Sequence, residues 1–226
     1  MSNRTFSILG DSISTFKGYH PPQNEVFYPR EEYDVKEVEQ TWWSILSKRM
    51  GLTLLCNESY SGARVSYTGA RPATSCFQHE ERQKCLKGSI IIVFGGTNDW
   101  GQLDDPTTLE IFAQAYDSLV SSMLLRHSDS ALYFCTPLQR IDRSLTTPNI
   151  HGWTQLDTAQ TIRDIVSRYS KANLIDLSAH HIEANSPLLP DGVHPGKEGM
   201  ELLASLIEGG LTSRQSVVAH AGHLTL

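Results

Sequence analysis

The strongest constraint on the fold is an alternation of short apolar runs with segments of helical periodicity. Between the runs, apolar residues recur every three to four positions, which is typical of helices that pack against a sheet. Such alternation indicates parallel βαβ units. We therefore predict a three-layer α/β/α sandwich around a five-stranded, mostly parallel sheet. The five runs, all rich in β-branched residues, are 4–9, 52–56, 89–94, 131–135 and 173–177.

Helices are predicted in the intervening segments. The clearest is 107–126, where the apolar residues share one face; Asp105 is the candidate N-cap and Pro106 lies in the first turn. The segment 209–226 shows no clear periodicity, so no element is predicted for this tail. The other predicted helices are 40–50, 75–86, 154–169 and 197–207.

The composition favours one globular domain over 1–226. A chain of 226 residues with 39% hydrophobic residues can bury a full core, and no repeat or low-complexity linker divides it. The net charge of −6 and the lack of a Lys/Arg block disfavour a nucleic-acid partner. The longest apolar run, 90–94, is far too short to span a membrane.

The N-terminus carries no basic segment followed by an apolar signal core, so we expect a cytoplasmic protein; a secreted mature chain is the alternative. The cysteines form no CxxC pair, which favours reduced thiols over a disulfide framework or a metal site. They are Cys56, Cys76, Cys85 and Cys135.

Polar residues with catalytic potential follow several of the predicted strands. Ser12 ends the first strand in a Gly-Asp-Ser sequence, while Gly62 and Asn98 come just after the second and third. Asp191 and His194, in the sequence Pro-Asp-Gly-Val-His-Pro, lie beyond the fifth. Because the carboxyl ends of parallel strands share one edge of a sheet, we expect these residues to converge there.

The convergence would supply what a serine nucleophile requires. A hydroxyl needs a base in contact and a third group to orient that base, roles that suit His194 and Asp191 for Ser12. Backbone N–H groups of Ser12 and Gly62 and the side-chain amide of Asn98 would form an oxyanion hole. Each motif alone would be an ordinary turn.

A metal site is the alternative interpretation of Asp191 and His194. A zinc or iron site needs a third ligand, and neither His180 nor His181 nor a cysteine pair offers an obvious one. We therefore predict no metal and no cofactor.

Together the four blocks resemble the SGNH family of GDSL-type esterases and lipases, over roughly 6–206. The resemblance implies a flavodoxin-like fold, with Ser12, Asp191 and His194 as the triad and Gly62 and Asn98 completing the oxyanion hole. An isoleucine follows Ser12 where leucine is usual, which conserves volume. The chain contains no Gly-x-Ser-x-Gly elbow, which disfavours the α/β-hydrolase alternative.

The family leaves the substrate open, because it includes lipases, thioesterases, arylesterases and carbohydrate deacetylases. Two long connections, 14–39 and 137–153, carry aromatic residues, and long loops in compact domains tend to be functional. Aromatic rings with polar tips suit sugars or small aromatic ligands; the alternative is that they anchor the loops. The candidate substrate-binding residues are Tyr19, Tyr28, Trp100 and Trp153.

The leading hypothesis is a metal-independent serine esterase that acts on short acyl esters, with acetyl groups on a saccharide as the favoured case. No long apolar stretch outside the predicted elements offers a lid, so a lipase or thioesterase is the less favoured alternative. A non-catalytic binding module on the same fold is the alternative from another class.

Overall fold

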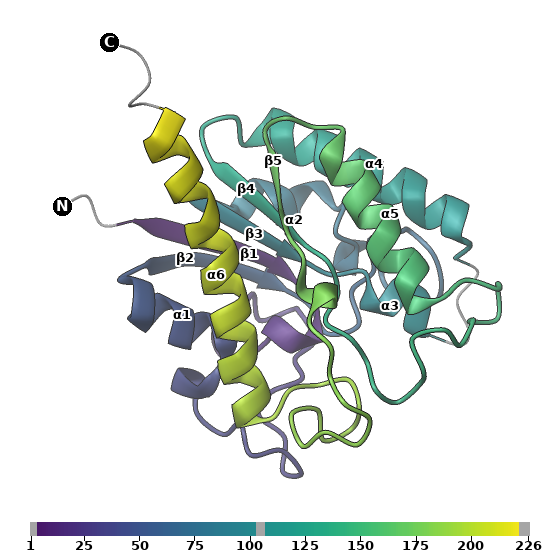
Figure 1. Cartoon of the computed structure of the whole chain (residues 1–226). Helices are drawn as coiled ribbons and strands as arrows, with labels where there is room; N and C mark the ends of the chain where they lie inside the picture. Colours follow the sequence, from purple (N-terminus) through teal and green to yellow (C-terminus); the bar gives the residue numbers. More distant parts are fainter. Residues whose placement is uncertain (1–3, 103–106, 222–226) are drawn as a thin grey trace.

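The computed structural model describes residues 4–102 and 107–221, with side chains up to residue 213. Its centre is a sheet of five parallel strands in the order β2-β1-β3-β4-β5 (Figure 1). This confirms the predicted α/β fold, with every strand pair parallel. The strands are β1 (Thr5–Gly10), β2 (Thr53–Ser59), β3 (Ile90–Phe94), β4 (Ala131–Cys135) and β5 (Ala172–Ile175).

The strand order fixes where a ligand can bind. From β1 the chain crosses to β2 on one side and later to β3 on the other, so the connections diverge between β1 and β3. In open parallel sheets, the crevice at such a switch point lies outside the carboxyl ends of the strands. The loops that follow β1, β2 and β3 therefore meet at one place.

Helices cover both faces of the sheet (Figure 1). Helices α1 and α6 share one apolar cluster with the sheet, and α4 and α5 share the other. The described helices are α1 (Trp42–Met50), α2 (Glu80–Cys85), α3 (Thr97–Gly101), α4 (Leu109–Arg126), α5 (Gln155–Ser167) and α6 (Lys197–Ala221).

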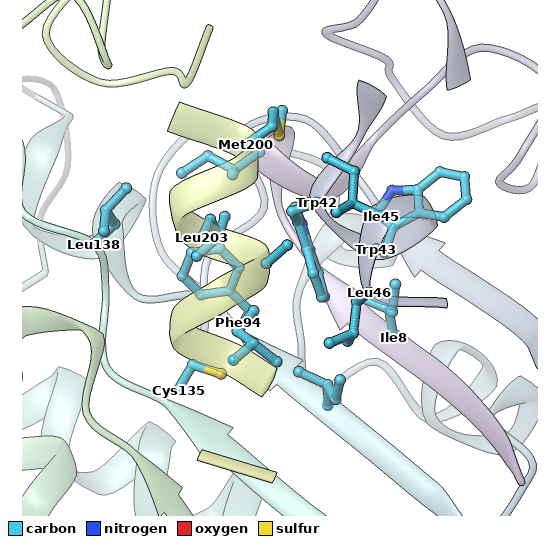
Figure 2. Packing of buried hydrophobic residues seen from close by; sticks show 14 of the residues in the cluster. Ile8, Trp42, Trp43, Ile45, Leu46, Phe94, Cys135, Leu138, Met200 and Leu203 are labelled. Atoms are coloured by element: carbon cyan, nitrogen blue, oxygen red, sulfur yellow. The ribbon is translucent and has the colours of Figure 1, made fainter. Parts of the chain in front are cut away.

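The central strands are buried on both faces, which explains their continuous apolar sequence. Alternate residues of β3 enter opposite clusters: Ile92 and Phe94 face α1 and α6, while Ile91 and Val93 face α4 and α5. Figure 2 shows Phe94 among apolar side chains of the first face. Burying each such side chain contributes roughly 1.5 to 3 kcal/mol.

Strand β2 continues three residues past its predicted end at residue 56, into polar sequence. The extension is possible because the polar side chains are satisfied inside the protein: Asn57 donates to the Ser14 carbonyl, and Ser59 donates to the Asn57 side chain. Buried polar groups that find partners do not end a strand.

Several predicted helices begin later than expected, by one or two residues for α1, α4 and α5 and by five for α2. The N-cap of α4 is Thr108, whose hydroxyl accepts from the Ile111 amide at 3.2 Å; the predicted cap and first-turn residues, Asp105 and Pro106, lie outside the described residues. The predicted helix 75–86 reduces to α2, because the Phe77 amide bonds to the Arg64 carbonyl instead of to a helical partner.

Helix α6 extends into the tail for which no element was predicted. The pair Gly209 and Gly210 resembles a helix end in sequence, but the helix continues to Ala221. At Gly210 an added Cβ would lie 2.8 Å from the Ile175 side chain, so the glycine lets the helix approach β5 closely. Within the described part of the chain, we find no helix with the length and apolarity that a membrane span requires.

Candidate active site

The predicted nucleophile lies in a tight turn directly after β1. The chain passes from Gly10 into a short 3-10 turn, Ser12–Ser14, in which the Ile13 amide donates to the Asp11 carboxylate at 3.1 Å. A Cβ on Gly10 would lie 2.6 Å from the Ser59 hydroxyl, so a larger residue would push the turn away from β2. Packing therefore favours glycine at position 10, and Asp11 caps the turn that carries Ser12.

The far end of this turn is held by three side chains on other elements. At the start of α1, the indole of Trp42 donates to the Ser14 hydroxyl and that of Trp43 to the Ser14 carbonyl, both at 3.1 Å. The Asn57 amide donates to the same carbonyl at 2.9 Å. These contacts fix the backbone on which the Ser12 hydroxyl is carried.

The predicted triad residues form one continuous chain of hydrogen bonds. The Ser12 hydroxyl lies 2.9 Å from His194 Nε2, and His194 Nδ1 lies 2.7 Å from the Asp191 carboxylate. The other carboxylate oxygen accepts from the backbone amides of Val193 and His194. An ionised carboxylate only accepts, so Nδ1 carries the proton and Nε2 is left to accept from Ser12.

The turn that carries this pair depends on Gly192. Its φ of +81° lies in the left-handed region, which favours glycine. A Cβ there would also lie 2.6 Å from the Asp142 amide nitrogen. The Ile141 amide donates to the Gly192 carbonyl at 2.8 Å, so the loop after β4 supports the turn.

Aromatic residues of the loop after β1 surround the imidazole. The Phe27 ring stacks on His194 with centroids 3.6 Å apart and planes 11° from parallel. The Tyr33 hydroxyl is hydrogen-bonded to Asp191. Burial acts to raise the pKa of Asp191, but the hydrogen bonds from His194 and Tyr33 outweigh it and hold that pKa well below its ordinary value. The carboxylate is thus kept charged.

The two predicted oxyanion residues lie on adjacent loops. Gly62 follows β2 with a φ of +76°, and Asn98 lies in the first turn of α3. The Asn98 amide nitrogen donates to the Ala63 carbonyl at 2.9 Å, which ties the two loops together. That nitrogen carries two hydrogens, and among the described residues one bond is found, so the second is available to a substrate oxygen.

Sequence reasoning missed Asp99, which stabilises the same loop. Its buried carboxylate accepts from the backbone amides of Val65 and Ser66, both at 2.9 Å, and from the Ser66 hydroxyl at 2.7 Å. The available signal in the sequence was an acidic residue directly after Asn98, a few positions past an apolar strand. Asp99 and Asn98 together hold the loop that begins at Gly62.

Of the four predicted substrate-binding residues, three are packed inside the fold. Tyr28 is fully buried and donates to the Pro195 carbonyl at 2.7 Å. The indole nitrogens of Trp100 and Trp153 donate to backbone carbonyls at 3.0 and 3.2 Å. These rings anchor the long loops instead of lining an open site. Tyr19 is 48% exposed and rests against the Trp43 ring.

Among the described residues, no group of three or more histidine, cysteine or acidic side chains is placed to hold a metal ion. The four cysteines are free thiols, of which Cys76 and Cys135 are buried, Cys56 is half-buried and Cys85 is exposed.

The fold and these residues define an acyl hydrolase of the GDSL type. The model of the GDSL-like lipase/acylhydrolase family matches residues 4–208, and the chain belongs to that family. Membership supports ester hydrolysis as its general activity.

Solved structures agree with this assignment. A protein assigned as a GDSL-like lipase from Bacteroides ovatus is 28% identical, with 94% of this chain and 100% of that chain covered and a TM-score of 0.69. Its counterpart from Bacteroides uniformis is also 28% identical, with coverages of 93% and 96% and a TM-score of 0.69.

More distant structures share the fold. A family two carbohydrate esterase from Clostridium thermocellum, in complex with cellohexaose, is 16% identical, with 94% of this chain and 65% of that chain covered and a TM-score of 0.64. A comparison with curated proteins gave no match.

Proposed function

We propose that the protein is a serine esterase that hydrolyses short-chain acyl esters through an acyl-enzyme intermediate, without a metal ion or cofactor. The observation that carries the proposal is the unbroken hydrogen-bond chain from the Ser12 hydroxyl through His194 to Asp191. A serine hydroxyl is a weak nucleophile by itself, and this arrangement gives it a base in direct contact.

In the first half of the reaction, the Ser12 oxygen attacks the ester carbonyl carbon while His194 Nε2 takes the hydroxyl proton. The ionised Asp191 stabilises the imidazolium that forms. Negative charge on the carbonyl oxygen is met by the amides of Ser12 and Gly62 and by the Asn98 side chain. The tetrahedral intermediate collapses by breaking the bond to the alcohol, which leaves with the proton from His194.

In the second half, water takes the place of the alcohol. His194 removes a proton from the water as the water oxygen attacks the acyl carbon, and the same oxyanion donors stabilise the second tetrahedral intermediate. When the bond to Ser12 breaks, the serine oxygen regains a proton from His194. The carboxylic acid leaves and the starting enzyme is restored.

We favour O-acetylated carbohydrates as the substrate class. Structures with this fold include the carbohydrate esterase that was solved with cellohexaose and an acetyl xylan esterase that is 14% identical, with a TM-score of 0.63 and coverages of 90% and 97%. The sequence also offers no long apolar segment that would cover a long acyl chain.

Acyl-chain preference tests this proposal. A chain gains about 0.8 kcal/mol per methylene only where that methylene is buried. We therefore expect acetyl and butyryl p-nitrophenyl esters to have higher kcat/KM values than octanoyl or palmitoyl esters. A profile that climbs steadily past eight carbons would instead place the protein with the lipases or thioesterases.

A further inference from the structure

A cavity of about 180 Å³ lies in the loop between β2 and α2, and one of its lining residues, Arg71, contacts Gly62 of the predicted oxyanion hole. The loop that forms it starts at Gly62, and its lining includes Arg64, Ser66, Tyr67 and Arg71. The triad and the oxyanion hole leave this cavity unused.

Arg71 forms the boundary between the cavity and the catalytic centre. Its guanidinium lies so close to Gly62 that a Cβ on that glycine would overlap it. On the other side, Arg71 pairs with the Glu25 carboxylate at 2.5 Å, and the Glu25 carbonyl accepts from the Ser61 amide at 2.9 Å. A group bound against Arg71 would therefore lie beside the backbone that is expected to receive the oxyanion.

The cavity lining combines an aromatic ring with hydrogen-bonding groups. The aromatic ring is that of Tyr67, which is 57% exposed to solvent. Beneath it lie the Ser66 hydroxyl and the Arg64 guanidinium, which are buried and donate within the protein, to Asp99 at 2.7 Å and to the Thr68 carbonyl at 2.8 Å. The groups of the lining that a ligand can reach are therefore the Tyr67 ring and the Arg71 guanidinium.

These groups suit a ring that is rich in hydroxyls. The aromatic face of Tyr67 can pack against the C–H face of a sugar, while the Arg71 guanidinium donates hydrogen bonds to its oxygens. Glu25 offsets the positive charge of Arg71, so the pair can both donate and accept. The combination favours a neutral polyol over an anion.

We propose that this cavity binds the sugar ring of an O-acylated saccharide, with Arg71 and Tyr67 as specificity-determining residues. The acyl group would then extend past Arg71 toward Ser12. The inference rests on the proposed esterase function and adds to it the place where the alcohol part of the ester binds.

Binding to an inactive variant tests the inference directly. An O-acetylated xylo-oligosaccharide is titrated into Ser12→Ala by calorimetry, and then into that variant with Arg71→Ala or Tyr67→Ala added. We expect each added change to raise Kd at least tenfold. Arg126→Ala is the matched control, because Arg126 also forms an ion pair, with Glu80 at 3.4 Å. Arg126 is the last residue of α4 and precedes β4, so it lies toward the amino ends of the strands, away from the catalytic edge. This control should leave Kd unchanged.

Failure to bind the oligosaccharide, or equal Kd values in the Arg71 and Tyr67 variants and their parent, would overturn the inference. A loss of binding in Arg126→Ala as well would also count against it. Circular dichroism checks that each variant is folded.

Hydrolysis of p-nitrophenyl acetate separates this inference from the proposed function. That ester has no sugar, so its hydrolysis by the wild type depends on the triad and the oxyanion hole and not on the cavity. A wild type that fails to hydrolyse it contradicts the proposed esterase, whereas normal hydrolysis without saccharide binding contradicts the cavity inference alone.

Discussion

Two groups of residues act on Ser12, and they are built differently: the base side consists of His194 and Asp191, and the oxyanion side of Gly62 and Asn98. On the base side, Asp191 accepts hydrogen bonds from the His194 ring, from two backbone amides and from Tyr33, and Phe27 covers one face of the imidazole. On the oxyanion side, the loop that begins at Gly62 is held from behind: Asn98 donates to the Ala63 carbonyl, and Asp99 accepts from the amides of Val65 and Ser66.

The difference follows from what each side must do. A base works best when its orientation and tautomer are fixed before the substrate arrives, so its hydrogen-bonding capacity is used up within the protein. Oxyanion donors must keep hydrogens free for the transition state, so their support comes from the far side of the loop. The comparison predicts that disrupting each side changes different kinetic constants.

The largest effect of a side-chain change is expected on the base side. Asp191→Asn removes the charge that fixes the tautomer of His194, and comparable changes in serine hydrolases lower kcat about 10⁴-fold. The measurement is kcat with p-nitrophenyl acetate. Glu183→Gln is the matched control, because Glu183 faces His181 at 3.4 Å in an exposed histidine–carboxylate pair. Activity within tenfold of wild type in Asp191→Asn would remove Asp191 from the triad.

The next effect is expected on the oxyanion side. Asn98→Ala removes a donor that acts mainly in the transition state, so kcat should fall about 100-fold with little change in KM. The exposed Gln114, which bonds to Glu110 within α4, gives the control variant Gln114→Ala. If KM alone rises in Asn98→Ala, the amide binds the substrate without stabilising the transition state.

Tyr33→Phe tests whether the contact between the Tyr33 hydroxyl and Asp191 contributes to catalysis. The change deletes a hydrogen bond to the charged Asp191, and the loss of about 1.4 kcal/mol for such a bond would lower kcat/KM about tenfold. Tyr169→Phe is a close match, since the Tyr169 hydroxyl bonds to Asp117 at 3.1 Å away from the site. Identical kcat/KM values in the two variants would show that Tyr33 only packs the loop.

Removal of metal ions is expected to have no effect on activity. Incubation with EDTA should leave kcat/KM for p-nitrophenyl acetate unchanged, because the proposal assigns Asp191 and His194 to proton transfer and not to a metal. If EDTA abolished activity and zinc or manganese restored it, Asp191 and His194 would be metal ligands. The distinction between a base side and an oxyanion side would then no longer hold.

The sheet could be predicted from sequence because burial on both faces forces a distinctive pattern. Strands such as Ile90–Phe94 are apolar throughout, and no surface helix or loop needs such a run. The turn at Gly10 and the one at Gly192 were also accessible, since each permits little other than glycine.

Contacts between residues far apart in the sequence could not be predicted in the same way. Phe27 and Tyr33 were visible as loop aromatics, but their places beside His194 and Asp191 depend on how a long loop folds back. Trp100 is likewise an aromatic residue that follows a strand, yet it is buried and donates to a backbone carbonyl. Residue type alone cannot separate a ring that supports the catalytic base from one that anchors a loop.

Labelling with a fluorophosphonate probe tests the central claim most directly, because only an activated serine reacts with it. We expect one adduct on Ser12, identified by peptide mass spectrometry, and no labelling of the folded Ser12→Ala variant. An unlabelled wild-type protein, or a Ser12→Ala variant that still carries the adduct on another serine, would contradict the assignment of Ser12 as the nucleophile.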